Sequence, residues 1–176
     1  AMRVLTFRRV GPVVSAGDAA IAGRFSAEHG DLRPRLADLR RAADSVGVLP
    51  GPQALAQARQ VQHWLQHDLL PHERAEQETL YPMLARVLGG EGRTSTMSRA
   101  HLEIAHLTRR LGGVISDSGD PPTDEDLADI RRLLYSLHAV LSLHFDQEEE
   151  SYLYVAGDGD GAAESLSGAG GRVDRP

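Results

Sequence analysis

Two copies of a His-x-x-x-Glu pattern are the most informative feature of the sequence. They are formed by His72 with Glu76 and by His144 with Glu148. On a helix, residues four positions apart lie only about 40° apart around the axis and one turn apart along it. Each imidazole can therefore reach the same point as the carboxylate that follows it. Because both groups bind divalent cations, the two pairs predict two halves of one metal site.

Two further histidines, His29 and His101, stand among apolar residues at the three- and four-residue spacing of core-facing helix positions. A single histidine in such a place is typical of a hydrogen-bonded core residue. Four imidazoles and two carboxylates facing one core would be costly to bury without partners, since buried acids need neutralising charge. A dinuclear metal centre removes that cost. This ligand set suits iron, with manganese and zinc as alternatives.

Better-known metal patterns are incomplete in this chain. The segment HERAE at 72–76 matches the HExxH of zinc proteases, except that Glu76 replaces the second histidine and a ligand is lost. Glu103 and His106 form a single Glu-x-x-His, whereas ferritin-like di-iron bundles need that pattern twice. The chain has no cysteine, which excludes iron–sulfur ligation, thiolate zinc sites and cysteine nucleophiles. Any metal must therefore be held by histidines and carboxylates.

Length and charge narrow the class of protein. A chain of 176 residues is expected to form one domain with a substantial core. It has 25 acidic and 19 basic residues, for a formal charge of −6, and it has no dense Lys/Arg block. We therefore expect no nucleic-acid partner. No stretch approaches 18 apolar residues, so we expect no membrane span and a cytoplasmic location.

Helix-forming residues dominate, and no stretch alternates as a strand would, so the sequence predicts an all-α fold. Four helices are expected, the second kinked or divided at Pro71, at 18–46, 53–88, 95–116 and 123–154. Short connections between these helices predict an antiparallel up-and-down four-helix bundle. The histidines and glutamates described above predict a di-metal site at its centre. The expected organisation is an N-terminal extension, the bundle and a Gly-rich flexible tail, at 1–17, 18–155 and 156–176.

Four segments together resemble the haemerythrin-like family, which is also called the HHE cation-binding domain. The resemblance covers about residues 20 to 155, and the segments agree with the family in order, residue type and spacing. They are EHGDLRPRL around His29, LLPHERAEQETLYPML around His72, SRAHLEIAHL around His101 and LSLHFDQEEESYLY around His144. This resemblance implies two iron ions bridged by Glu76 and Glu148. It also implies that His29 and His72 serve one iron, and that His101 and His144 serve the other.

The sequence departs from the oxygen carriers of that family at two points. Those proteins add a fifth histidine one turn after the third-helix ligand, where this chain has Ala105, and they end with a bridging aspartate where this chain has a glutamate. His106 does not replace the missing ligand, because it lies about 140° around the helix from His101. Three side chains are candidates for the vacant position, besides water: Glu73, Tyr81 and Tyr135. An open position would let a small molecule bind and react.

Other polar residues near the ligands have two interpretations. Five carboxylates could accept the free N–H of a coordinating imidazole or face solvent: Glu28, Glu73, Glu78, Glu149 and Glu150. Four histidines are interpreted as surface or packing residues: His63, His67, His106 and His138. Trp64 is expected in the core or at an interface.

The pattern supports three functional hypotheses. The first is a reactive di-iron protein that consumes a small oxidant such as nitric oxide or peroxide, with the metals carrying the chemistry. The second is a module that binds oxygen or iron and signals occupancy without turnover, to a protein partner that the sequence does not name. The third is an interaction scaffold in which the histidines only pack. Whether the protein is an enzyme stays open at this point, and turnover separates the first two hypotheses.

Overall fold

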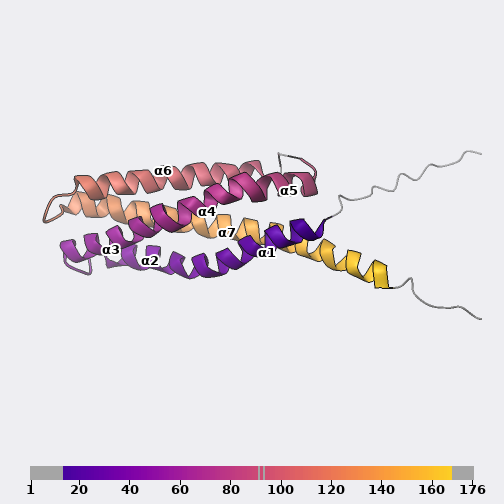
Figure 1. The fold of residues 1–176 in the computed structure, drawn as a ribbon. Coiled ribbons are helices and arrows are strands. Elements are labelled where there is room, and N and C mark those ends of the chain that lie inside the picture. Colours follow the sequence, from indigo (N-terminus) through magenta and orange to yellow (C-terminus); the bar gives the residue numbers. More distant parts are fainter. Residues whose placement is uncertain (1–13, 91, 93, 168–176) are drawn as a thin grey trace, which may run out of the picture.

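The computed structural model describes residues 14–90, 92 and 94–167. Within these residues the chain is helical and contains no strand, apart from an isolated bridge between Val46 and Leu49. The helices form four long rods that lie side by side (Figure 1). The predicted all-α class is therefore confirmed. None of the described helices is long and apolar enough to cross a membrane.

The first rod consists of α1 (Ala16–Leu32), the short 3-10 helix η1 (Arg33–Arg35) and α2 (Leu36–Ser45). It begins at a capping box, in which Ser15 is the N-cap and the Asp18 side chain accepts a hydrogen bond from the Ser15 backbone. The predicted helix began at residue 18, which lies inside α1, so the predicted start was too late. Pro34 explains the break that the single predicted helix lacked, because proline donates no backbone hydrogen bond.

The second rod runs from Gly51 to Leu88 and is interrupted twice. It comprises α3 (Gly51–Trp64), η2 (Leu65–Leu69), α4 (Leu70–Ala75), η3 (Glu76–Leu80) and α5 (Tyr81–Leu88). Both η2 and η3 are π-helical, and each lies just before a proline, Pro71 or Pro82. A proline removes one hydrogen bond and crowds the preceding turn, and the wider π turn accommodates this defect. The irregularity predicted at Pro71 is thus a π segment.

The third rod is α6 (Ser95–Asp117) and the fourth is α7 (Asp124–Ser167). Thr123 and Asp126 form a second capping box at the start of α7. The end of α7 lies well beyond the predicted end near Tyr154. No proline interrupts this stretch, and each glycine costs a helix only about 1 kcal/mol relative to alanine. In Figure 1 the yellow end of α7 extends past α5 and α6.

The predicted flexible tail and N-terminal extension fall largely outside the description. Residues 1–13 and 168–176 lie outside the described residues, so the corresponding parts of the predicted segments 1–17 and 156–176 have no structural account. The described part of the tail, up to Ser167, belongs to α7.

The helices pack around two clusters of buried apolar side chains. Helix α7 contacts α1, α2, α3 and α6, so it is central to the packing. Along α7, Leu141 and Phe145 belong to one cluster, and Tyr152 and Val155 belong to the other. Glu148 lies between them and is fully buried. The polar layer that contains it is therefore enclosed by hydrophobic core on both sides.

Candidate metal centre

All six predicted ligands converge within this polar layer. They come from each of the four rods: His29 on α1, His72 on α4, Glu76 on η3, His101 on α6, and His144 and Glu148 on α7. All six are buried, and none is more than 8% exposed. The four imidazoles present the same atom, Nε2, to the two carboxylates. The helical spacing that predicted two pairs thus places both pairs around one centre.

Glu76 is at the middle of this arrangement. Its Oε1 lies 3.1 Å from Nε2 of His29 and 3.1 Å from Nε2 of His72. Its other oxygen, Oε2, lies 3.4 Å from Nε2 of His101. One carboxylate therefore faces imidazoles of three different rods.

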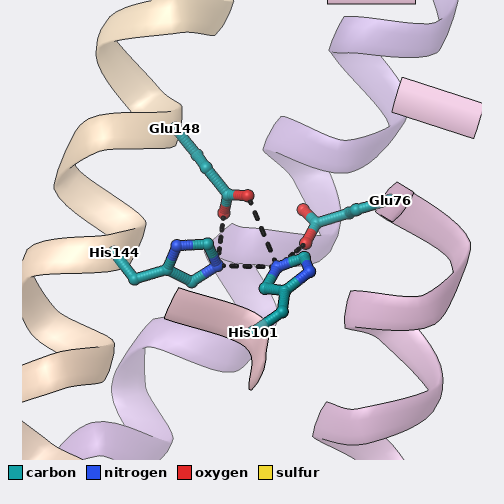
Figure 2. A group of neighbouring side chains, drawn as sticks. All are labelled: Glu76, His101, His144 and Glu148. Atoms are coloured by element: carbon teal, nitrogen blue, oxygen red, sulfur yellow. Dashed lines mark hydrogen bonds and ion pairs between the residues drawn. The ribbon is translucent and has the colours of Figure 1, made fainter. Parts of the chain in front are cut away.

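Glu148 faces the same space from α7. Its Oε2 lies 3.3 Å from Nε2 of both His144 and His29. Its Oε1 lies 3.8 Å from Nε2 of His101. Figure 2 shows Glu148 and His144 on one side and Glu76 and His101 on the other, with their polar ends directed at one another. The arrangement therefore offers carboxylate oxygens from two opposite sides.

Two groups of potential metal ligands overlap here. The first contains Glu76, His101, His144 and Glu148, and the second contains His29, His72 and Glu76. Within each group, one ligand atom from every residue lies within 4.8 Å of the others. Glu76 belongs to both groups, so it could join two neighbouring ions.

The polar atoms of the layer fit a cation better than they fit one another. Among the described residues, several buried atoms have no hydrogen-bond partner: Nε2 of His72, Oε2 of Glu76, Oε2 of Glu148 and Oε1 of Glu73. The Nε2 atoms of His101 and His144 lie only 2.9 Å apart, and two imidazoles can share at most one proton across that distance. Unpaired buried polar groups are costly, and coordination would satisfy them together.

Without a cation, the two carboxyl groups differ in protonation: Glu76 is ionised and Glu148 is neutral. Burial disfavours ionisation of Glu76, but the close imidazoles of His101, His29 and His72 outweigh it and hold its pKa well below the usual range. Burial and the neighbouring charge of Glu76 raise the pKa of Glu148. Two like charges this close are unfavourable, so one acid stays protonated. Burial also lowers the pKa of His144 to about 3, which keeps that imidazole neutral and able to bind a metal.

Helix α1 orients one imidazole from outside the layer. The Nδ1 atom of His72 lies 2.8 Å from Oε2 of the half-buried Glu28. A carboxylate on the free ring nitrogen fixes the orientation of a coordinating histidine and strengthens it as a ligand. The sequence left open whether Glu28 supports a coordinating imidazole or faces solvent. This contact shows that its carboxylate lies against the ring nitrogen of His72 that faces away from the centre. His29 is held differently, by stacking on Phe145 with 4.4 Å between ring centroids.

Two buried tyrosines donate to the carboxylates. The Tyr81 hydroxyl contacts Oε1 of Glu148 and lies 2.9 Å from Nε2 of His101. The Tyr152 hydroxyl donates to Oε1 of Glu76 over 3.0 Å. Burial and the nearby acid charges raise the pKa of both phenols, so both keep their protons.

Sequence reasoning included Tyr81 but missed Tyr152. Tyr152 follows Glu148 by four residues, as Glu148 follows His144, so the one-turn spacing could have identified it. Tyr81 follows Glu76 by five residues, and the π turn between them brings it onto the same face.

Tyr135 was wrongly considered for the vacant metal position. Its side chain is 37% exposed, and its hydroxyl donates to Asp44 on α2. It lies more than two turns before His144 on α7, which places it outside the layer. Glu73 is closer to the predicted role, because it is only 3% exposed. Burial, together with the charges of Glu76 and Glu148, raises its pKa well above the usual range.

A cleft lies over the position where a fifth histidine is missing. Its volume is about 410 Å³, and its lining includes Glu73, His101 and Ala105. Ala105 follows His101 by one turn and ends at Cβ, so it leaves this space open.

The four histidines that were not predicted as ligands lie outside the layer: His63, His67 and His106 are exposed, and His138 is half-buried. Trp64 is buried in the core, as predicted.

The geometry agrees with what comparison with known proteins finds. A model of the hemerythrin HHE cation binding domain matches residues 20–156. The chain belongs to this family. The membership predicted from four separate sequence segments is therefore confirmed. No match was found among curated proteins or among solved structures. The hemerythrin HHE domain is a cation-binding domain, and the buried histidines and glutamates of this member could hold a metal.

The two tyrosines predicted as candidates for the vacant position provide a matched test, because Tyr81 lies at the centre and Tyr135 lies outside it. We expect Tyr81→Phe to weaken binding of divalent metal by about tenfold, because partners of the ligands typically contribute factors of 10 to 100. Tyr135→Phe removes a hydroxyl that bonds Asp44 instead, so its metal affinity should equal that of the wild type. Competition titration with a chelator measures both. Equal affinities for the two variants would exclude a role for Tyr81 at the centre.

Proposed function

We propose that this protein is a non-haem di-iron member of the hemerythrin HHE family that binds and reacts with a small oxidant, namely oxygen, nitric oxide or peroxide. The observation that supports this proposal best is the shared position of Glu76 between two groups of potential ligands. Such a carboxylate can bridge two cations, with Glu148 as the second bridge. The proposal includes an antiparallel up-and-down order of the four rods.

Iron is preferred because the donors are imidazoles and carboxylates without a thiolate. Manganese and zinc suit the same donors and are therefore outcomes of the metal analysis. When bound, an iron pair would supply electrons to, or accept them from, the small molecule. His29 and His72 would hold one ion, and His101 and His144 would hold the other.

The protein contributes position, proton control and access. Glu28 fixes the ring of His72. The Tyr81 phenol keeps a proton at the hydroxyl that faces His101 and Glu148, where it can donate to a bound ligand. The apolar clusters on both sides exclude bulk water from the layer. The cleft over Ala105 leaves a route for a molecule the size of the proposed oxidants.

Metal content combined with turnover tests this function. Protein loaded anaerobically with ferrous iron should retain about two irons per chain, as its two overlapping ligand groups imply. With an added reductant that supplies the electrons for each turnover, it should then consume many equivalents of peroxide or nitric oxide per chain. Less than one iron per chain after loading would refute the di-iron centre. Full iron with a single stoichiometric event would refute turnover and favour the alternative described next.

A sensing module without turnover is the second candidate. Helix α7 favours it, because this one helix carries both His144 and Glu148 and continues without a break to Ser167. A change in how the ligands are held could therefore reach the far end of the helix. A sensor should bind oxygen or iron once and change the helix content or the protease sensitivity of that end.

A further inference from the structure

A second group of histidines lies outside the metal centre, on the surface of the second rod. His63 lies near the end of α3, and His67 lies in η2. They are the only two histidines of the sequence that stand four positions apart. Both side chains are exposed, and their rings stack with 4.1 Å between centroids and 19° between planes. The two imidazoles therefore share one place on the surface.

The backbone explains why the two rings meet. On a regular α-helix, residues four positions apart differ by about 40° in direction. Segment η2 is π-helical, and the Leu70 N–H bonds the carbonyl of Leu65, five residues earlier. Because a π turn contains more residues than an α turn, each residue advances by a smaller angle and the offset shrinks. At the junction of α3 and η2, His67 thus lies almost directly one turn after His63.

One hydrogen bond prepares His67 as a metal ligand. Its Nδ1 lies 2.8 Å from the backbone carbonyl oxygen of His63. A carbonyl oxygen only accepts, so Nδ1 carries the proton, and Nε2 of the neutral ring keeps a free lone pair. Coordinating histidines are commonly held in this way, with the second ring nitrogen donating to a backbone carbonyl. His67 therefore has the tautomer of a metal ligand.

From this arrangement we infer that His63 and His67 form an outer binding site for one divalent ion of the Ni²⁺, Cu²⁺ and Zn²⁺ class. Rotation of the two exposed rings about their Cβ–Cγ bonds can bring one nitrogen of each to about 2.0–2.1 Å from the same ion. The inference goes beyond the proposed function and does not depend on the buried centre.

The donors of this outer site differ from those of the buried centre. The centre combines imidazoles with carboxylates, whereas no third histidine or acid of the described chain joins His63 and His67 in a ligand group. Imidazole donors bind nickel, copper and zinc well, and nickel and copper stand above iron in the general order of affinity. The outer site should therefore favour these later metals, with water in the remaining coordination positions.

Retention of the tag-free protein on an immobilised nickel column tests the site, because the buried ligands of the centre cannot reach an immobilised ion. We expect His63→Asn/His67→Asn to elute at an imidazole concentration at least about tenfold lower than the wild type, since two linked donors bind far better than one. Each single variant should elute close to the double variant. The matched control is His106→Asn, which removes an exposed histidine without a second histidine four positions away and should elute with the wild type. Circular dichroism verifies the fold of every variant.

Equilibrium dialysis with Ni²⁺ then tests binding of the free ion. The wild type and the double variant share the same buried centre, so the difference between them reports the outer site whether or not that centre holds iron. The wild type should bind about one more Ni²⁺ per chain than the double variant at about pH 7.5, where ordinary imidazoles are mostly neutral. Equal Ni²⁺ binding by the two proteins would overturn the inference. A loss of column retention in His106→Asn as large as that of the double variant would also overturn it, because the number of exposed histidines and not their pairing would then decide binding.

Discussion

Glu76→Gln should abolish stoichiometric binding at both metal positions, lowering bound iron from about two to less than half an ion per chain. The carboxylate lies 3.1 Å from His29, 3.1 Å from His72 and 3.4 Å from His101, so both proposed ions depend on it. Glutamine keeps the size of the side chain but removes its charge and one acceptor oxygen. A bridging role predicts a joint loss, because neither group of ligands is complete without Glu76.

The control for this prediction lies in the same π segment. Glu78 is exposed and absent from both ligand groups, so Glu78→Gln should bind metal as the wild type does. Elemental analysis after ferrous loading and desalting measures the bound metal, and circular dichroism of the metal-free proteins verifies the fold. Retention of one full equivalent by Glu76→Gln would show that Glu76 serves a single ion and would contradict the bridge.

The sequence was sufficient to predict which six residues come together, because helical spacing is a local property. Once His72 and Glu76, or His144 and Glu148, are on helices, one-turn spacing alone directs each pair to one point. His29 and His101 were identified by the same rule applied to apolar neighbours. The structure brings these six residues together, although their role as metal ligands stays a prediction until metal is measured.

Other features depend on contacts between rods and were not predictable in this way. Tyr135 has the residue type of a metal ligand, but the packing of α7 on α2 gives it Asp44 as a partner. Tyr81 reaches Glu148 only because a π turn adds a residue between Glu76 and the next proline. The end of α7 was misplaced because glycine weakens a helix without necessarily ending it.

Removal of the metal should lower the melting temperature by about 10 °C, and the loss should be larger at pH 8 than at pH 5.5. The lower melting temperature follows from the buried polar layer, because its unpaired atoms destabilise the metal-free fold. The pH dependence follows from protons that the metal must displace. Burial and the charge of Glu76 raise the pKa of Glu148. The close carboxylates of Glu76 and Glu28 outweigh burial and raise the pKa of His72.

The sign of the pH effect can be derived for the metal-free protein first. A group whose pKa is raised by folding stabilises the fold below its unfolded pKa and loses that contribution as the pH rises through the folded value. Glu148 therefore stabilises the metal-free fold less at pH 8 than at pH 5.5, and so does His72. His144 has a lowered pKa and acts in the opposite direction, but its contribution is nearly complete by pH 7.

The metal-bound protein has the opposite preference, because coordination requires ionised carboxylates and neutral imidazoles. Rising pH removes the protons that compete with the metal while it weakens the metal-free fold, so the gap in melting temperature should widen. Thermal melts with and without chelator between pH 5.5 and 8 measure this gap. In the metal-free protein, Glu148→Gln lacks the carboxyl with the raised pKa, so its melting temperature should fall less between pH 5.5 and 8 than that of the wild type, whereas the exposed Glu150→Gln on the same helix should keep the wild-type dependence. A gap that narrows as the pH rises would mean that the layer does not exchange protons for metal.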